Sequence, residues 1–171
     1  MPVPDVVVTA GRRSPWCRVA DDAWSVEQHH RVRREVFVEE QGLFHPDDLD
    51  PHDEDPSTIK VLGLHGREPA GAVRLFPLDP DGLRWQGDRL AVLPGHRRHR
   101  GGAPLVRFAV QTASEHGGQL MVAHIQVANV GFFERLGWRC DGPRERYVGV
   151  EHQPMAIDLR PSVDRRPAAG G

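Results

Sequence analysis

A segment rich in arginine and glycine, GHRRHRGGAPL at Gly95–Leu105, has the residue types that bind an anion. It separates a strand-like apolar run from a helix-like amphipathic run. A helix N-terminus carries unpaired N–H groups and a partial positive charge, and glycines let the backbone come close to a phosphate or pyrophosphate. Charge-assisted hydrogen bonds would come from Arg97, Arg98 and Arg100. The pattern favours phosphate binding over two alternatives, a solvated arginine face and a nucleic-acid contact.

The charge balance argues against nucleic acid as the partner. The formal net charge is −2 at pH 7, and residues 45–56, HPDDLDPHDEDP, are strongly acidic. Proteins that bind nucleic-acid phosphates usually carry a positive balance. Within the acidic segment, Asp50 and Asp53 could attract a cationic amine, and the alternative is a solvated, mobile loop.

Three side chains are candidates for a general base. His124 lies in an apolar run over residues 119–127, and an imidazole titrates in the range that base catalysis needs. His152 lies in a later strand-like run, and Glu40 lies at the end of the first predicted helix. For each of them a structural role is the alternative, either a hydrogen-bonded histidine or a solvated helix end.

These residues are expected to belong to one domain. The chain has 171 residues, of which 39% are hydrophobic and 27% charged, as is typical of a soluble globular domain. The domain is predicted to span residues 15–160. Residues 1–14 are poorly patterned, and residues 161–171 are small, polar and expected to be disordered.

The sequence shows no targeting or metal signal. No apolar run approaches the ~20 residues of a membrane helix, and the first residues lack a signal-peptide pattern. Cys17 and Cys140 are too few for a disulfide framework, so we expect a cytoplasmic protein that contacts no membrane. The ten histidines have no metal-ligand spacing, so no metal is expected.

Alternating patterns predict the elements that position the candidate residues. Asp21 or Asp22 caps a helix that runs to about Glu40. Its apolar side is Trp24, Val32, Val36 and Phe37. A helix over residues 103–118 has Pro104 in its first turn, and a shorter helix covers 129–138. Strands are predicted at 15–20, 58–66, 69–77, 88–94, 119–127, 144–150 and 153–159. The order β-α-β-β-β-α-β-α-β-β indicates a mixed α/β sheet with helices on its faces and not a doubly wound fold.

Two motifs in this order resemble the GCN5-related N-acetyltransferase (GNAT) superfamily. They are DRLAVLPGHRRHRGGAPLVRFAV and NVGFFERLGW, and the likeness extends over residues 21–159. It implies a mostly antiparallel central sheet and acetyl-CoA as cosubstrate. The pyrophosphate loop of the family matches Arg98, His99, Arg100, Gly101, Gly102 and Ala103. An alternative register that starts at Arg97 would place Arg100 where the family usually has a glycine. We therefore prefer the register that starts at Arg98.

The resemblance also implies contacts with the rest of the cosubstrate. Asn129 would bond the pantetheine arm, and Phe133 would pack near the thioester. Backbone N–H groups at Ala91, Val92 and Leu93 would polarise the thioester carbonyl. The family often has a tyrosine that acts as general acid where this chain has Phe133. Three alternatives follow: another group protonates the thiolate, the thiolate leaves without protonation, or the activity is lost.

Shorter stretches give a finer likeness. The segments RREVFVEEQG, AHIQ and EHQPM are similar to the ElaA-type acetyltransferases and to an uncharacterised bacterial subgroup often encoded near nitrilases. Acyl-homoserine-lactone synthases share a similar N-terminal region. The likeness implies a monomeric or homodimeric N-acyltransferase for a small amine or amino-acid-like acceptor. The alternative is a non-catalytic acyl-CoA-binding module.

Overall fold

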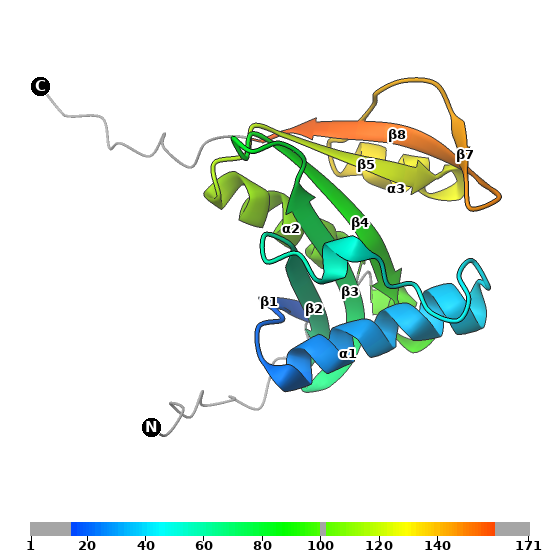
Figure 1. The fold of residues 1–171 in the computed structure, drawn as a ribbon. Helices are drawn as coiled ribbons and strands as arrows, with labels where there is room; N and C mark the ends of the chain where they lie inside the picture. Colours follow the sequence, from blue (N-terminus) through cyan, green and yellow to red (C-terminus); the bar gives the residue numbers. More distant parts are fainter. Residues whose placement is uncertain (1–14, 100–101, 160–171) are drawn as a thin grey trace, which may run out of the picture.

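The computed structural model describes residues 15–99 and 102–159, and the expectations for residues 1–14, Arg100, Gly101 and 161–171 lie outside this part. One eight-stranded sheet runs through the described chain in the order β1-β2-β3-β4-β5-β8-β6, with β7 paired to β8 (Figure 1). All of its strand pairs are antiparallel except β4–β5. The predicted fold class, a mixed and mostly antiparallel sheet with helices on both faces, is confirmed.

The strands follow the apolar runs of the sequence. They are β1 (Pro15–Val19), β2 (Ile59–His65), β3 (Glu68–Pro77), β4 (Arg84–Val92), β5 (Leu120–Gln126), β6 (Arg139–Cys140), β7 (Glu145–Tyr147) and β8 (Val150–Asp158). Three details differ from the prediction. The predicted strand over residues 144–150 is divided by a turn, because β7 ends at Tyr147 and β8 already begins at Val150. Strand β4 begins at Arg84 and not at Asp88, because Trp85 and Gln86 pair with Pro77 and Phe76 of β3. The two-residue strand β6 has no periodic signal to reveal it.

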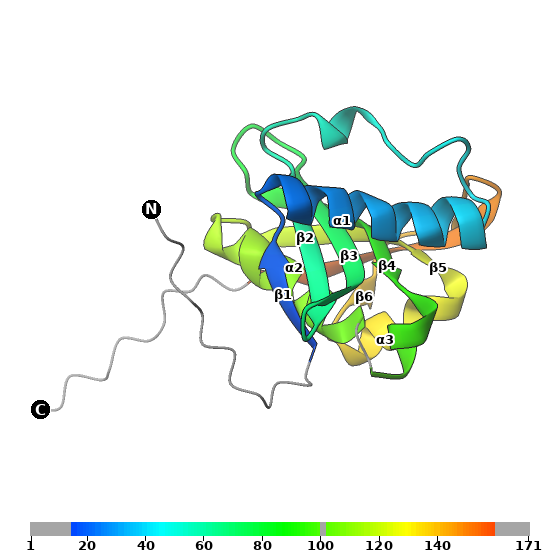
Figure 2. The same ribbon diagram turned by 90° about the horizontal axis from the view of Figure 1, so that it is seen from below.

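Helices cover both faces of the sheet. Helix α1 (Ala23–Arg33) continues as a π-helical segment, η1 (Arg34–Glu40), and crosses one face, whereas α2 (Gly102–Glu115) and α3 (Val130–Arg135) pack on the other (Figure 2). Short 3-10 turns are η2 (Pro51–Asp53), η3 (Pro94–His99) and η4 (Val127–Asn129). None of the helices in the described ranges is long and apolar enough to cross a membrane.

The start of α1 confirms the predicted cap at Asp22. Its carboxylate accepts a hydrogen bond from the Ser25 N–H at 2.7 Å, and the Ser25 hydroxyl oxygen accepts one from the Asp22 N–H at 3.3 Å. Trp24 was placed wrongly on the apolar side of this helix, because its side chain is 46% exposed. Val32, Val36 and Phe37 are buried, as expected. The apolar period is therefore carried by the second half of the helix.

Strands β4 and β5 separate soon after they meet. They pair only at Arg84–Leu120, Trp85–Met121 and Gln86–Val122. Farther along, the register between β3 and β4 shifts, since Arg74 pairs with Asp88 but Ala72 pairs with Ala91. This leaves one extra residue in β4, and Arg89 has a positive φ of 51° there. The bulge bends β4 away from β5 and opens a gap in the sheet.

Candidate active site

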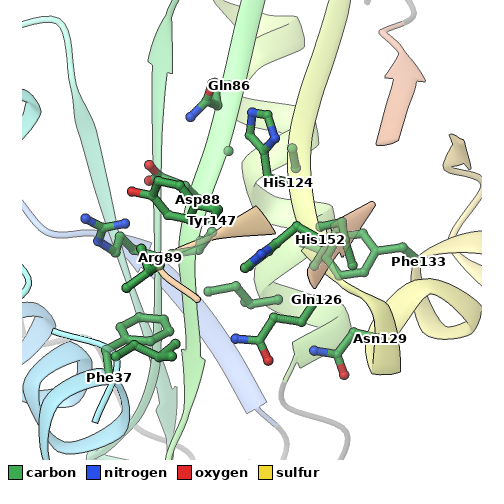
Figure 3. Close-up of a pocket in the computed structure, with 18 of the residues that line it drawn as sticks. Phe37, Gln86, Asp88, Arg89, His124, Gln126, Asn129, Phe133, Tyr147 and His152 are labelled. Atoms are coloured by element: carbon green, nitrogen blue, oxygen red, sulfur yellow. The ribbon is translucent and has the colours of Figure 1, made fainter. Parts of the chain in front are cut away.

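A cavity of about 300 Å³ occupies the gap between β4 and β5 (Figure 3). Its lining includes Gln86–Leu90 of β4 and Ala123–Gln126 of β5. Because successive side chains of a strand point to opposite faces, both faces of the sheet contribute to the lining. We therefore divide its lining into two parts, a polar lobe on one face of the sheet and an apolar lobe on the other.

The polar lobe lies on the face that α1 covers. We define it by Gln41, Gln86, Asp88, Arg89, His124, Gln126, Glu145, Tyr147 and His152. Gln86 and Asp88 project from β4, and His124 and Gln126 project from β5 across the gap (Figure 3). This lobe holds the groups that can accept or donate a proton.

His124 is paired with Glu145 in this lobe. Its Nδ1 contacts Glu145 Oε1, and both side chains are nearly half exposed. With Nδ1 donating to the carboxylate, Nε2 is the nitrogen that can accept a proton. His124, which the sequence predicts to lie at the cleft, thus has a carboxylate partner. This partner, Glu145, belongs to β7.

His152 lies beside the only tyrosine of the chain. Its side chain is buried, its Nδ1 lies 2.8 Å from the carbonyl oxygen of Val150, and its ring centroid is 5.7 Å from that of Tyr147. Tyr147 and His152 both line the polar lobe, because the β7–β8 hairpin places them over the gap. The tight turn of this hairpin has positive φ at Val148 and Gly149.

A buried arginine–aspartate network adjoins the polar lobe through Asp88 and Arg89. Its members are Arg33, Arg74, Arg89, Asp48, Asp50, Asp53 and Asp88. The Arg74 side chain is fully buried and donates to Asp50 at 2.6 Å, Asp53 at 3.1 Å and Asp88 at 2.7 Å. The acidic segment is therefore fixed to the sheet, and both earlier interpretations, an open amine attractor and a mobile loop, are wrong for Asp53.

The network lowers the pKa of two of its carboxylates, those of Asp53 and Asp50. Burial alone would raise the pKa of Asp53, but hydrogen bonds from Arg33 and the charges of Arg33 and Arg74 outweigh it, so the pKa falls well below its usual range. The same balance, with Arg74 as the main donor, lowers the pKa of Asp50. The network as a whole consists of four aspartates and three arginines.

The apolar lobe lies on the face that α2 and α3 cover. We define it by Val73, Leu90, Val106, Ala109, Met121, Ala123, Ile125, Phe133 and Trp138. Most of these side chains belong to the main hydrophobic core. Phe133 packs edge-on against Trp138, with ring centroids 5.4 Å apart. Asn129 and Phe133, both predicted from the second motif, line the cavity where η4 and α3 meet β5.

The arginines of the predicted anion loop, which precedes α2, differ in their contacts. Arg97 donates to the carboxylate of Glu40 and to the Val92 carbonyl oxygen at 3.0 Å. The hydrogen bond from Arg97 is the main cause that lowers the pKa of Glu40. Glu40 is thus a paired surface carboxylate outside the described lining of the cavity.

Of the other loop residues, the structure describes the side chains of Arg98, Gly102 and Ala103. Arg98 is exposed on η3, and Gly102 and Ala103 open α2. A Cβ at Gly102 would lie 3.4 Å from the Phe132 ring, so the start of α2 packs closely on α3.

The end of β4 differs in one respect from the expected thioester contact. The Leu93 N–H is occupied, because it donates to the Ala70 carbonyl oxygen at 2.8 Å. Ala91 and Val92 lie opposite Ala72 and Gly71 of β3, and since neighbouring N–H groups of a strand point to opposite edges, the Val92 N–H points away from β3. The part of β4 that lines the cavity runs from Gln86 to Leu90 and includes the bulge at Arg89. A bulge leaves backbone groups outside the regular ladder, so it is the better place for an N–H directed at a ligand.

The residues that the sequence did not single out are Glu145 and the three arginines of the network. Glu145 shows no periodic signal and reaches His124 only through the fold of the β7–β8 hairpin. A signal did exist for Arg33 and Arg74, since each charge stands where an apolar residue would continue its element. Among the described residues, no cluster of three or more His, Cys, Asp and Glu side chains could hold a metal.

Comparisons with known proteins agree with this geometry. The sequence profile described as the acetyltransferase (GNAT) family matches residues 18–138. The chain is 28% identical over 128 residues to the uncharacterized N-acetyltransferase YjcF of Bacillus subtilis, which covers 74% of this chain and 88% of YjcF. Escherichia coli ElaA is similar in structure, with a TM-score of 0.73, 20% identity, and coverage of 83% of this chain and 98% of ElaA. BjaI, a CoA-dependent acyl-homoserine lactone synthase solved with SAM and isopentyl-CoA, has a TM-score of 0.70 at 22% identity, covering 86% of this chain and 83% of that chain.

Proposed function

The chain belongs to the acetyltransferase (GNAT) family, and from this premise we propose that it is an acyl-CoA-dependent N-acyltransferase that acylates an amine. The observation that carries the proposal is the position of the His124–Glu145 pair at the gap between β4 and β5. A base at this place can act on a nucleophile that enters from the polar lobe. The thioester would reach the same point from the side of the anion loop.

The reaction is a direct transfer. The amine nitrogen attacks the thioester carbonyl carbon, the C–S bond breaks, and an amide and a CoA thiolate form. His124 Nε2 takes the proton that the amine loses, and Glu145 stabilises the resulting imidazolium. A backbone N–H of the bulge at Arg89 and Leu90 stabilises the charge that develops on the carbonyl oxygen.

Tyr147 is the group we assign to thiolate protonation. Tyr147 would have the role that a tyrosine at the position of Phe133 often has in the family. Its side chain lines the polar lobe from the β7–β8 hairpin. His152, whose ring lies against Tyr147, is a positioning residue in this proposal. Glu40 has no part in proton transfer, since its carboxylate is bound to Arg97.

Binding of the CoA moiety is assigned to the loop before α2 and to the gap. The first turn of α2, together with the loop residues Arg98, Arg100 and Gly101 that precede it in the sequence, would hold the pyrophosphate. Arg97 supports the loop through its pair with Glu40. Asn129 would bond the pantetheine arm at the edge of the gap. Acetyl-CoA remains the reference donor for these assignments.

The acceptor is proposed to be a small amine with an amino-acid-like group. Asp88 and Glu145 place carboxyl groups in the lining of the polar lobe, and these groups would attract a cationic amine. BjaI, which has this fold, was solved with SAM, a molecule that carries an amino-acid group.

The test is calorimetric titration with acetyl-CoA, followed by a thiol-release assay on a panel of amines. One binding site per chain and CoA release that rises with an amine would support the transferase. Phe133 at the tyrosine position favours a second candidate, a non-catalytic acyl-CoA-binding module, which would bind but not release CoA faster with any amine. Absence of binding would refute both.

A further inference from the structure

Arg89 belongs both to the arginine–aspartate network and to the lining of the polar lobe. We propose that its guanidinium binds a carboxylate of the acceptor, so that the acceptor is an amino acid or another amine that carries a carboxylate, and not a simple amine. The inference rests on the proposed function, because it concerns the substrate that enters the polar lobe. It adds the residue that selects this substrate and the group that is selected.

The backbone of Arg89 has an unusual conformation. Its φ of 51° lies in the left-handed region, which residues with a long side chain seldom adopt. Such a conformation costs free energy, persists only where the surrounding structure enforces it, and is common at sites that bind a ligand. The backbone therefore points to Arg89 as a functional residue, and the contacts of its side chain indicate what it binds.

The side chain of Arg89 is buried and fixed in place. Only 8% of it is exposed, and its guanidinium carbon lies 4.5 Å from the centroid of the Phe44 ring, in a cation–π contact. Phe44 packs edge-on against Phe37, with ring centroids 6.4 Å apart, and both rings line the cavity. The guanidinium is thus preorganised at the cavity wall, so it loses little conformational entropy when it binds a ligand.

The network pairs Arg89 less tightly than its other two arginines. The contacts of Arg89 with Asp48 and Asp50 have lengths of 3.2–3.4 Å. Asp48 accepts a shorter hydrogen bond, of 2.7 Å, from Arg33. Asp50 accepts one of 2.6 Å from Arg74. Because charge-assisted hydrogen bonds are strongest when they are short, the two aspartates interact mainly with these other arginines.

One nitrogen of this guanidinium, Nη1, is available to a ligand. The hydrogen bonds that Arg89 makes within residues 15–99 and 102–159 use Nε and Nη2, and none uses Nη1. In the same ranges, the buried side-chain polar atoms without a partner are His30 Nδ1, Thr58 Oγ1 and Trp138 Nε1. Arg89 Nη1 is not among these enclosed atoms, so it reaches open space, and the open space beside Arg89 is the polar lobe (Figure 3). A guanidinium N–H at this place can donate to a carboxylate.

The charged groups of the polar lobe match a zwitterion. Arg89 lies on β4, and His124, the proposed base, lies on β5 across the gap (Figure 3). An acceptor with its amine at His124 and a carboxylate at Arg89 satisfies groups on both walls, whereas a simple amine leaves Nη1 without a partner. An unpaired polar group in a desolvated site costs binding free energy, so the site selects against acceptors that lack the carboxylate. The width of the gap sets the spacing of the two groups in the acceptor.

The first experiment compares ligands that differ only in the carboxylate. Calorimetry at saturating CoA measures Kd for the common α-amino acids and for the ω-amino acids up to 6-aminohexanoate, each beside its carboxamide. We expect at least one amino acid to bind about tenfold or more tightly than its carboxamide, because the carboxamide lacks the charge-assisted hydrogen bond. The pair with the largest ratio gives the spacing of amine and carboxylate. Equal binding within every pair, or binding of CoA without binding of any amino acid, would overturn the inference and leave the transferase proposal intact.

The second experiment removes the charge of Arg89. In Arg89→Gln the amino acid that wild type prefers should bind about tenfold or more weakly, and its carboxamide should change by less than about threefold. Arg31→Gln is the matched control, because Arg31 is an exposed arginine whose ion-pair partner is Glu35, four residues farther along the chain. Both Kd values should stay within about twofold of wild type in this control.

A folding defect can be separated from the loss of the ligand contact. Circular dichroism and the affinity for CoA report whether Arg89→Gln is folded. Should it be unfolded, Arg89→Lys keeps the positive charge beside Asp48 and Asp50 but lacks the guanidinium fork, and the preference for the carboxylate should fall by about threefold. An undiminished preference in the folded variant would overturn the inference. If the wild-type protein binds neither CoA nor any amino acid, the proposed function fails together with it.

Discussion

Asp53→Asn is predicted to destabilise the fold strongly. Asp53 accepts hydrogen bonds from Arg33 at 2.6 and 3.0 Å and from Arg74 at 3.1 Å, and both arginine side chains are fully buried. The asparagine keeps the shape but removes the charge, so two buried guanidinium groups lose a counter-ion. Breaking a buried pair in this way costs about 3–5 kcal/mol. Arg33 keeps Asp48 and Arg74 keeps two other carboxylates, so we expect the lower end, about 3 kcal/mol.

Urea unfolding at pH 7 measures this loss as a lower midpoint at an unchanged m-value. Asp21→Asn is the control, because Asp21 is an exposed partner of Arg18 and should change the free energy of unfolding by less than about 1 kcal/mol. A value for Asp53→Asn within 1 kcal/mol of wild type would refute the reasoning that the network is a buried structural unit.

The pH dependence of the same pair of proteins gives a second check. The pKa of Asp53 is lower in the folded chain than in the unfolded chain, so the folded state binds fewer protons at this site. Its stabilisation is present in full above about pH 4 and is lost as the pH falls through the folded pKa. The difference between wild type and Asp53→Asn should therefore be constant from pH 5 to 8 and shrink below pH 4. A difference that grew on acidification would have the wrong sign.

The other predictions concern the active site and its hairpin. His124→Ala should lower kcat by about 10²-fold or more at an intact fold, and an unaltered rate would remove His124 from the reaction. Glu145→Gln should lower kcat by about tenfold with little change in KM for the donor, whereas a purely structural role would leave kcat unchanged. Tyr147→Phe should lower kcat, as measured in the thiol-release assay. Adding Phe133→Tyr to this variant should restore part of the lost kcat. Val148→Asn should raise the free energy of unfolding by about 0.5–1 kcal/mol, because asparagine tolerates the positive φ of this turn better than valine; a urea midpoint at or below that of wild type would contradict this.

The sequence predicts the framework of the site well. The apolar periods locate β2, β3, β5 and β8, and the glycines and proline after Pro94 locate the start of α2. His124 and Phe133 come directly from these patterns, because each lies on an element whose apolar residues define its two faces. Such residues are predictable since their placement depends on local period and on the order of elements.

Contacts between distant segments were not predictable. Glu145 meets His124 only after β7 folds back on β8, and nothing in the local sequence distinguishes it from other surface glutamates. The composition of the acidic segment shows that it is charged but does not show which residues pair with it. Its partners are arginines of α1, β3 and β4. Glu40 and Arg97 form an ion pair, although the sequence predicts Glu40 as a general base and Arg97 as a phosphate ligand.

The three-residue junction between β4 and β5 has a consequence for motion. Amide hydrogens exchange fastest where few hydrogen bonds resist local opening, and the backbone that faces the gap beyond Gln86 and Val122 has no partner strand across it within residues 84–92 and 120–126. A molecule in the gap touches both halves of the sheet and slows that exchange, while β2 and β3, which are paired on both sides, keep their rates. Hydrogen exchange at this seam therefore reports occupancy by a donor before any acceptor is known.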